Sequence, residues 1–255
     1  MSPSTLRKPA VRVGAASHRG LVRSENQDRI SRFRTPYGDA YAVVDGMGGH
    51  ADGGRAAEIV IASFETVLGR LTAEVPASDA LHLAADTANE ELYRLSAGAD
   101  GRRMGATLVL AIVGSGTVLA HAGDSRAYLL RGGVLQRRTR DHTLVQGLLD
   151  RGILTERQAR EHPDSCVVTR AFGQEPKIEL EVASPFDLEA GDRLLLCSDG
   201  LCGYLDDATI STVLAASVSP QSVTDRLIEL ALEAGGEDNV SVQVIEVTEI
   251  SWSLP

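Results

Sequence analysis

The chain has 255 residues, 43% of them apolar and 24% charged, which is enough to bury the core of one large domain. Its formal net charge of -10 disfavours a general nucleic-acid-binding protein, since such proteins usually neutralise phosphates with basic surfaces. No segment approaches the roughly 20 apolar residues of a membrane helix, and Met1–Ala10 lacks the apolar stretch of a signal peptide. We therefore expect a cytoplasmic protein that binds neither nucleic acid nor membrane.

Short apolar runs punctuated by Gly, Pro, Asp or Ser recur along the chain, and this pattern is typical of β-strands. In chain order, the predicted strands are Val11–Ala16, Ala40–Val44, Thr107–Val113, Thr117–Ala122, Ala127–Leu130, Ile178–Val182, Arg193–Cys197 and Val240–Val247. Apolar residues at helical spacing predict helices at Gly54–Leu71, Ser78–Leu95, Asp206–Ala216 and Pro220–Ala234.

The helices come in pairs rather than one between each two strands, unlike a regular βαβ repeat. This order favours an α+β fold in which helices flank a central antiparallel β-sandwich. The polar segment Thr139–Phe172 contains helical fragments at Thr143–Arg151 and Thr155–Glu161, and we interpret it as a flap near a site. We expect one domain over residues 8–249, with tails at 1–7 and 250–255.

The three cysteines, Cys166, Cys197 and Cys202, are too few and too scattered for a disulfide framework. None of them begins a Cys-x5-Arg phosphate loop, which disfavours a phosphatase with a cysteine nucleophile. We expect all three to be buried as small apolar residues.

Five segments place an acidic residue beside Gly, Ser or Asn, next to an apolar run in most cases. Their carboxylates belong to Asp28, Asp45, Asp124, Asp199 and Asp238. Asp-rich oxygen ligands without His or Cys at metal-binding spacing favour Mg²⁺ or Mn²⁺ over Zn²⁺.

A simpler interpretation is that each of these residues only forms a turn, as Asp-Gly and Asn often do. Asp45 and Asp199, however, follow strongly apolar strands, and a carboxylate near the core needs a partner or a metal. The candidate cations nearby, Arg23 and Arg126, are too few to pair with all five carboxylates.

The segment Gly46-Met47-Gly48-Gly49-His50-Ala51 matches a relaxed dinucleotide-binding pattern. Asp45 directly before it would repel a pyrophosphate, and a second long helix follows instead of a parallel strand. We therefore reject a nucleotide-binding fold.

Taken together, these segments resemble the motifs of the bacterial-type metal-dependent serine/threonine protein phosphatases, known as the PPM or type 2C family. The resemblance runs from about Val11 to Val247. It is carried, in order, by Arg23-Ser24-Glu25-Asn26-Gln27-Asp28, Val44-Asp45-Gly46-Met47-Gly48-Gly49, Gly105-Ala106-Thr107, Ala122-Gly123-Asp124-Ser125-Arg126, Asp141-His142-Thr143, Thr169-Arg170-Ala171-Phe172-Gly173, Ser198-Asp199-Gly200-Leu201 and Glu237-Asp238-Asn239.

The resemblance implies two Mn²⁺ or Mg²⁺ ions. Asp45 would bridge them, the Gly46 carbonyl would be a further ligand, and Asp199 and Asp238 would complete the second ion. Asp124 would share a third, weaker ion with Asp199, as in bacterial members of the family. The alternative role for Asp124 is a turn contact or an ion pair with Arg126.

The resemblance also implies that Asp28 holds a metal-bound water and that Arg23 binds the substrate phosphate as a fork. The alternative for Arg23 is a surface salt bridge, for example with Glu25. The implied reaction is hydrolysis of phosphoserine and phosphothreonine on proteins by a metal-activated water, without a phosphoenzyme. A cognate bacterial serine/threonine kinase is the implied partner, and a monomer is the default expectation.

One departure from the family pattern is Met47, where many animal members carry a histidine that serves as a general acid. His50 and His142 are available instead, but a helix start and a turn contact explain them better. Two other functions stay open: a non-catalytic relative, which the intact aspartates disfavour, and a phosphatase for small phosphorylated molecules.

Overall fold

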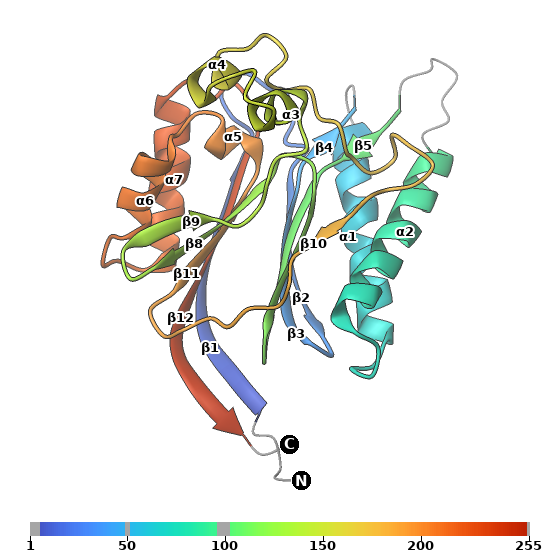
Figure 1. Cartoon of the computed structure of the whole chain (residues 1–255), viewed down its shortest axis with the longest axis vertical. Helices are drawn as coiled ribbons and strands as arrows, with labels where there is room; N and C mark the ends of the chain where they lie inside the picture. The colour runs from blue at the N-terminus through green and yellow to red at the C-terminus, as the bar shows by residue number, and fades with distance from the viewer. Residues whose placement is uncertain (1–5, 49–51, 96–102, 254–255) are drawn as a thin grey trace.

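Two antiparallel sheets form the centre of the molecule (Figure 1). The computed structural model describes residues 6–48, 52–95 and 103–253. The strand order of the first sheet is β1 (Leu6–His18), β12 (Val240–Ser253), β11 (Arg193–Cys197), β8 (Arg126–Arg131) and β9 (Val134–Arg137). That of the second is β10 (Glu181–Val182), β7 (Thr117–Ala122), β6 (Leu108–Gly114), β3 (Gly38–Val44) and β2 (Arg29–Thr35).

Helices cover the outer face of each sheet (Figure 1). The long helices α1 (Asp52–Arg70) and α2 (Ala77–Leu95) pack on the second sheet. The first sheet is covered by α5 (Asp199–Cys202), α6 (Asp207–Leu214) and α7 (Pro220–Glu233). The expected α+β fold, an antiparallel sandwich flanked by helices, is confirmed.

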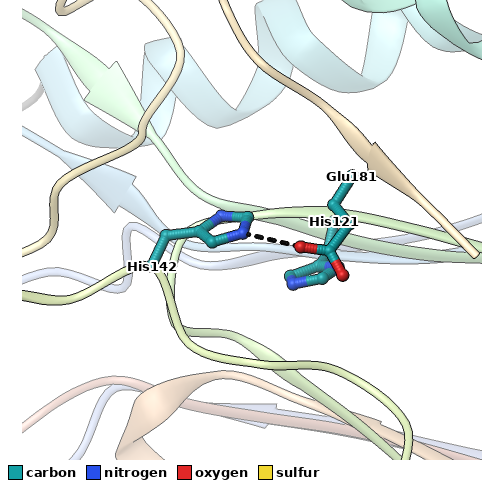
Figure 2. A group of neighbouring side chains, drawn as sticks. All are labelled: His121, His142 and Glu181. Carbon is teal, nitrogen blue, oxygen red and sulfur yellow. Dashed lines mark hydrogen bonds and ion pairs between the residues drawn. The ribbon is translucent and has the colours of Figure 1, made fainter. Parts of the chain in front are cut away.

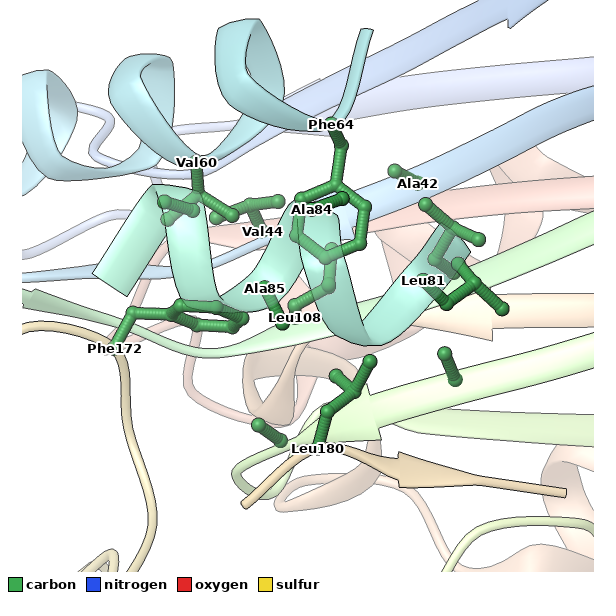
Figure 3. Packing of buried hydrophobic residues seen from close by; sticks show 14 of the residues in the cluster. Ala42, Val44, Val60, Phe64, Leu81, Ala84, Ala85, Leu108, Phe172 and Leu180 are labelled. Atoms are coloured by element: carbon green, nitrogen blue, oxygen red, sulfur yellow. The ribbon is translucent and has the colours of Figure 1, made fainter. Parts of the chain in front are cut away.

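The continuous apolar runs of the central strands follow from burial on both faces, because successive side chains of a strand point to opposite sides. In β3, Tyr41 and Val43 lie in the core between the sheets, whereas Ala42 and Val44 face α1 and α2. Figure 3 shows this outer core, where Phe64 of α1 packs edge to face with Phe172, their ring centroids 6.1 Å apart.

The flap and a small two-stranded sheet lie at the end of the sandwich opposite the chain termini (Figure 1). The small sheet consists of β4 (Gly46–Met47) and β5 (Gly105–Ala106), and the flap contains α3 (Leu144–Asp150) and α4 (Glu156–Arg160). Thr143 forms an isolated β-bridge with Val168 and also caps α3. This bridge closes the flap at its base.

The burial expected for the cysteines is correct for Cys197 and Cys202 and wrong for Cys166, which is exposed on the flap. No helix in the described ranges is long and apolar enough to cross a membrane. The domain limits at residues 8 and 249 stay a prediction.

Candidate metal centre

All five predicted aspartates lie beside the ends of strands. The strand ends in question are at the flap end of the sandwich (Figure 1). Asp28 directly precedes β2, Asp45 directly follows β3, and Asp199 begins α5 just after β11. Asp124 lies in the turn between β7 and β8, and Asp238 lies in the loop between α7 and β12. Antiparallel pairing therefore gathers at one end of the molecule residues that are far apart in the sequence.

Asp28 is the most deeply buried of the five, at 3% exposed. The Ser198 hydroxyl donates to Asp28 Oδ2 at 2.8 Å, and the same hydroxyl accepts from the Ser241 backbone N–H at 2.9 Å. Burial raises the pKa of Asp28 to about 6, although the hydrogen bond from Ser198 opposes the shift. A serine at the end of β11 thus fixes the carboxylate that precedes β2.

Burial also raises the pKa of the other inner carboxylates, and their negative neighbours raise it further. The pKa of Asp45 lies well above its usual range, because burial is reinforced by Asp28, Asp199 and Asp124. The pKa of Asp199 is raised to about 7 by burial and then by Asp238 and Asp28. These carboxylates are close enough to repel one another, so the centre holds an excess of negative charge.

Three oxygens of this group, Asp28 Oδ1, Asp124 Oδ1 and Asp199 Oδ1, are buried without a hydrogen-bond partner. Buried polar atoms in proteins almost always have a partner, which is a metal ion in some sites. Hard carboxylate oxygens with a nearby backbone carbonyl are the donors that Mg²⁺ and Mn²⁺ prefer. The residues at this site therefore fit divalent cations.

The two arginines that the sequence offered as counter-charges occupy different positions. Arg23 pairs with Asp238, Nη2 to Oδ2 at 2.8 Å, rather than with Glu25. Arg126 forms a fork on Asp141, with Nε 3.0 Å from Oδ1 and Nη2 2.6 Å from Oδ2. The alternative that Asp124 pairs with Arg126 is therefore wrong. Within the described part of the chain, Asp238 is the one carboxylate of the five that forms an ion pair with an arginine.

The backbone at Gly46 approaches its neighbours too closely for a side chain. A Cβ on Gly46 would lie 1.9 Å from the Gly53 carbonyl oxygen. The Thr107 N–H donates to the Asp45 carbonyl at 2.8 Å, and Thr107 Oγ1 lies 2.8 Å from Ser125 Oγ. Thr107 thus ties the turn that carries Asp45 to the turn that carries Asp124.

Asn239 holds the loop that carries Arg23. Its side-chain amide donates to the carbonyls of Arg19 and Glu25 at 2.8 Å each, and its Oδ1 accepts from the Gln27 N–H at 2.8 Å. Asn239 is only 5% exposed. Ser198, Thr107 and Asn239 all lie within the motifs that carry the family resemblance, but the sequence alone assigned no role to them.

The family model described as protein phosphatase 2C matches residues 16–234. The chain belongs to the protein phosphatase 2C family. Protein phosphatase PhpP of Streptococcus pneumoniae is 33% identical over 237 residues, which are 90% of this chain and 95% of PhpP. Serine/threonine protein phosphatase PstP of Mycobacterium tuberculosis is 39% identical over 250 residues, which are 95% of this chain and 46% of PstP. The chain thus spans about half the length of PstP.

A solved structure supports the cation fit. The catalytic domain of PstP, crystallised in complex with two manganese ions, matches this type 2C chain with a TM-score of 0.79 and 36% identity, over 94% of this chain and 99% of that one. Among the described residues, His142 forms no hydrogen bond or ion pair with the five carboxylates, and its ring bonds Gly123 and Glu181 instead. His50 lies outside the described residues.

Proposed function

We propose that the chain hydrolyses phosphoserine and phosphothreonine on proteins with the help of two Mn²⁺ or Mg²⁺ ions. The observation that carries this proposal is the group of buried carboxylates with three unpartnered oxygens, beside an exposed arginine. Membership of the protein phosphatase 2C family supports the reaction, and the manganese complex of the PstP catalytic domain supports the cofactor.

In this proposal Asp45, the Gly46 carbonyl, Asp199 and Asp238 hold the two cations. Bound divalent cations supply an activated water near neutral pH and neutralise charge on the phosphoryl group. Asp28, fixed by Ser198, orients the water through its unpartnered Oδ1.

Arg23 binds the phosphoryl oxygens of the substrate. Its side chain is 57% exposed, so the guanidinium is accessible, and its pair with Asp238 places it at the edge of the carboxylate group. A guanidinium presents two parallel donors that match two phosphoryl oxygens. When substrate binds, one face of the fork remains available for Asp238.

The substrates in this proposal are phosphorylated proteins, which is supported by the likeness to the protein phosphatases PstP and PhpP. We propose as finer points a cognate serine/threonine kinase, a cytoplasmic location, a monomeric state and one domain over residues 8–249. A third, weaker cation on Asp124 and Asp199 is a further proposal, supported by the unpartnered Oδ1 atoms of both residues.

The test is metal-dependent hydrolysis with a defined substrate panel. The protein is treated with chelator, dialysed, and assayed on phosphoserine, phosphothreonine and phosphotyrosine peptides and on small phosphate esters. We expect no turnover without metal, recovery with Mn²⁺ or Mg²⁺, and a preference for phosphoserine or phosphothreonine peptides. Full activity in excess chelator would contradict the metal requirement. A preference for small esters would instead favour the alternative of a small-molecule phosphatase.

A further inference from the structure

A second group of titratable side chains lies outside the carboxylate centre. It consists of His121 on β7, His142 at the base of the flap and Glu181 on β10 (Figure 2). Both histidines are buried, at 3% and 7% exposed, and their rings stack with centroids 4.6 Å apart. His142 Nε2 lies 3.2 Å from Glu181 Oε2. The composition of this group resembles that of a transition-metal site.

The hydrogen bonds of the group argue against a metal. The Gly123 N–H donates to His142 Nδ1 at 3.2 Å, so the neutral ring carries its proton on Nε2 and donates it to Glu181. That nitrogen therefore has no free lone pair for a metal, and Arg170 Nη1 stands only 3.3 Å from it. Burial lowers the pKa of His142, which favours this neutral form.

His142 is instead bound to the turn before Asp124 by two hydrogen bonds. Its backbone N–H donates to the Gly123 carbonyl at 2.9 Å, and its ring accepts the Gly123 N–H. Gly123 has φ +109°, and a Cβ there would lie 2.6 Å from the Thr107 side chain. This position in the turn therefore requires glycine, and the next residue is Asp124.

Asp124 depends on this turn for its orientation. The residue is 8% exposed, and its Oδ1 has no hydrogen-bond partner, so no other group holds the carboxylate at that atom. On the opposite side of His142, its carbonyl accepts from the Thr169 N–H at 2.7 Å. His142 thus connects the Asp124 turn to the base of the flap.

We propose that His142 is a positioning residue, whose neutral imidazole holds the Gly123 turn so that Asp124 is oriented to bind the third, weaker cation. This inference rests on the proposed function, because it assumes the cation site on Asp124 and Asp199. The imidazole touches neither substrate nor cation. It acts by accepting the hydrogen bond from the buried Gly123 N–H, which would otherwise have no partner.

The test compares three substitutions at position 142 in the full chain. His142→Ala removes the acceptor. His142→Asn keeps an acceptor oxygen near the position of Nδ1, and His142→Gln places its amide near Nε2 instead. His82→Ala, on the exposed surface of α2, is the matched control. Direct Mn²⁺ binding is measured by calorimetry, and the Mn²⁺ dependence of turnover is measured on the same samples.

We expect the parent to bind two Mn²⁺ ions tightly and one weakly. His142→Ala and His142→Gln should lower only the affinity for the weakly bound ion, by about fivefold or more. A loss of this size corresponds to the free energy of one buried hydrogen bond. His142→Asn should restore the parent affinity, and His82→Ala should not change it. In an Asp124→Ala background, which lacks the weak event, His142→Ala should cause no further change in metal response.

Several outcomes would overturn the inference. If the parent binds only two Mn²⁺ ions, the third cation site does not exist. If His142→Ala binds the weak ion as tightly as the parent does, His142 does not position Asp124. A lowered melting temperature with unchanged Mn²⁺ affinity would show that the histidine only stabilises the fold. Calorimetry needs no substrate, so it tests the role of His142 even if the parent hydrolyses no phosphopeptide. A lack of hydrolysis would contradict the proposed function but not this inference.

Discussion

Asp45 lies between β3, which is buried on both faces, and the short strand β4 that begins at Gly46. Its carboxylate is repelled by four neighbouring aspartates, and the proposed cations would relieve that repulsion. Asp199 is in a similar position at the end of β11. Neutral, nearly isosteric substitutions at these residues therefore separate their role in the reaction from their role in the fold.

Asp45→Asn or Asp199→Asn should lower the turnover rate by at least about a thousandfold, which corresponds to about 4 kcal/mol of activation free energy. The metal-free variants should melt no lower than the metal-free parent, since each removes a buried charge that lacks a partner. Steady-state kinetics and thermal melts on the same samples check this. Asp39→Asn, on the strand that precedes Asp45 but paired with Arg32, is the control. A variant within tenfold of the parent would contradict the ligand assignment.

Arg23→Ala should raise KM and lower kcat, with a combined loss of about 10- to 100-fold in kcat/KM, because it removes charge-assisted hydrogen bonds to the phosphate. Arg23→Lys should recover little of this, since an ammonium lacks the planar fork. Metal affinity should stay close to that of the parent. Arg32→Ala removes another exposed arginine–aspartate pair, away from the site, and should be neutral. If both Arg23 variants showed the kinetics of the parent, Arg23 would not bind the phosphate and would form only a surface salt bridge.

At the scale of elements, the loop between β1 and β2 is held by a residue from the other end of the chain. Asn239 makes three hydrogen bonds to it, so the loop presents Arg23 in one arrangement. The position of Arg23 thus depends on the residue that precedes β12 as well as on its own segment.

Asn239→Ala should therefore reduce stability and activity together. Leaving three half-buried backbone groups without their side-chain partner should cost about 1–3 kcal/mol and lower the melting temperature by several degrees. The kcat/KM on phosphopeptides should fall by about tenfold beyond the loss of folded protein, because Arg23 is no longer held. Gln221→Ala is the control, since Gln221 bonds both backbone groups of Ala15 on β1 away from the site. Normal kinetics per folded molecule would contradict a positioning role for Asn239.

The elements that the sequence predicted well are those with strong apolar patterns. Thr117–Ala122 and Arg193–Cys197 were predicted with their observed limits, because both strands are buried on both faces. β2 was missed because its Arg29, Arg32 and Arg34 mask a strand that packs beside β3. The two-residue strands β4 and β5 and the one-turn helix α5 were missed because they are too short for a periodic pattern.

The same limit applies to the site. Most of the aspartates could be found because they lie next to an apolar run, and the resemblance to the family motifs pointed to the whole set. The support from Ser198, Thr107 and Asn239 could not be predicted, because each contacts a residue more than 50 positions away through a turn or loop. The pairing of Arg126 with Asp141 rather than Asp124 likewise depends on how the strand after Asp124 meets the flap.

At the scale of the whole molecule, the sandwich confines a cluster of like charges to one end. Its two sheets share a dry core, with residues such as Tyr41, Leu129 and Leu194 at no more than 1% exposed. This core and the two helical layers hold the carboxylates together against their mutual repulsion. The stability of the metal-free protein should therefore depend on the protonation of the site.

The sign of that dependence follows from the raised pKa values of Asp28, about 6, and Asp199, about 7. In the unfolded chain both pKa values lie near 4, so the folded state binds these protons more tightly. Their contribution to stability is fully present below about pH 4 and is lost as the pH rises through about 6 to 7. His121 and His142, whose pKa values are lowered by burial, act in the opposite direction.

Melting curves in chelator should therefore show that the contribution of the carboxylates to stability falls between about pH 5 and about pH 8. Comparing the parent with Asp28→Asn separates this contribution from that of the histidines, which both proteins share. Relative to the parent, the metal-free variant should gain up to about 3 kcal/mol at the upper pH and little at the lower. In saturating Mn²⁺ the parent should become more stable as the pH rises, since cations bind the ionised carboxylates and not the folded protein's protonated ones. If the stability of the parent and of Asp28→Asn in chelator had the same pH dependence, the pKa of Asp28 would not be raised. If Mn²⁺ did not change the melting temperature of the parent at any pH, the cation site itself would be contradicted.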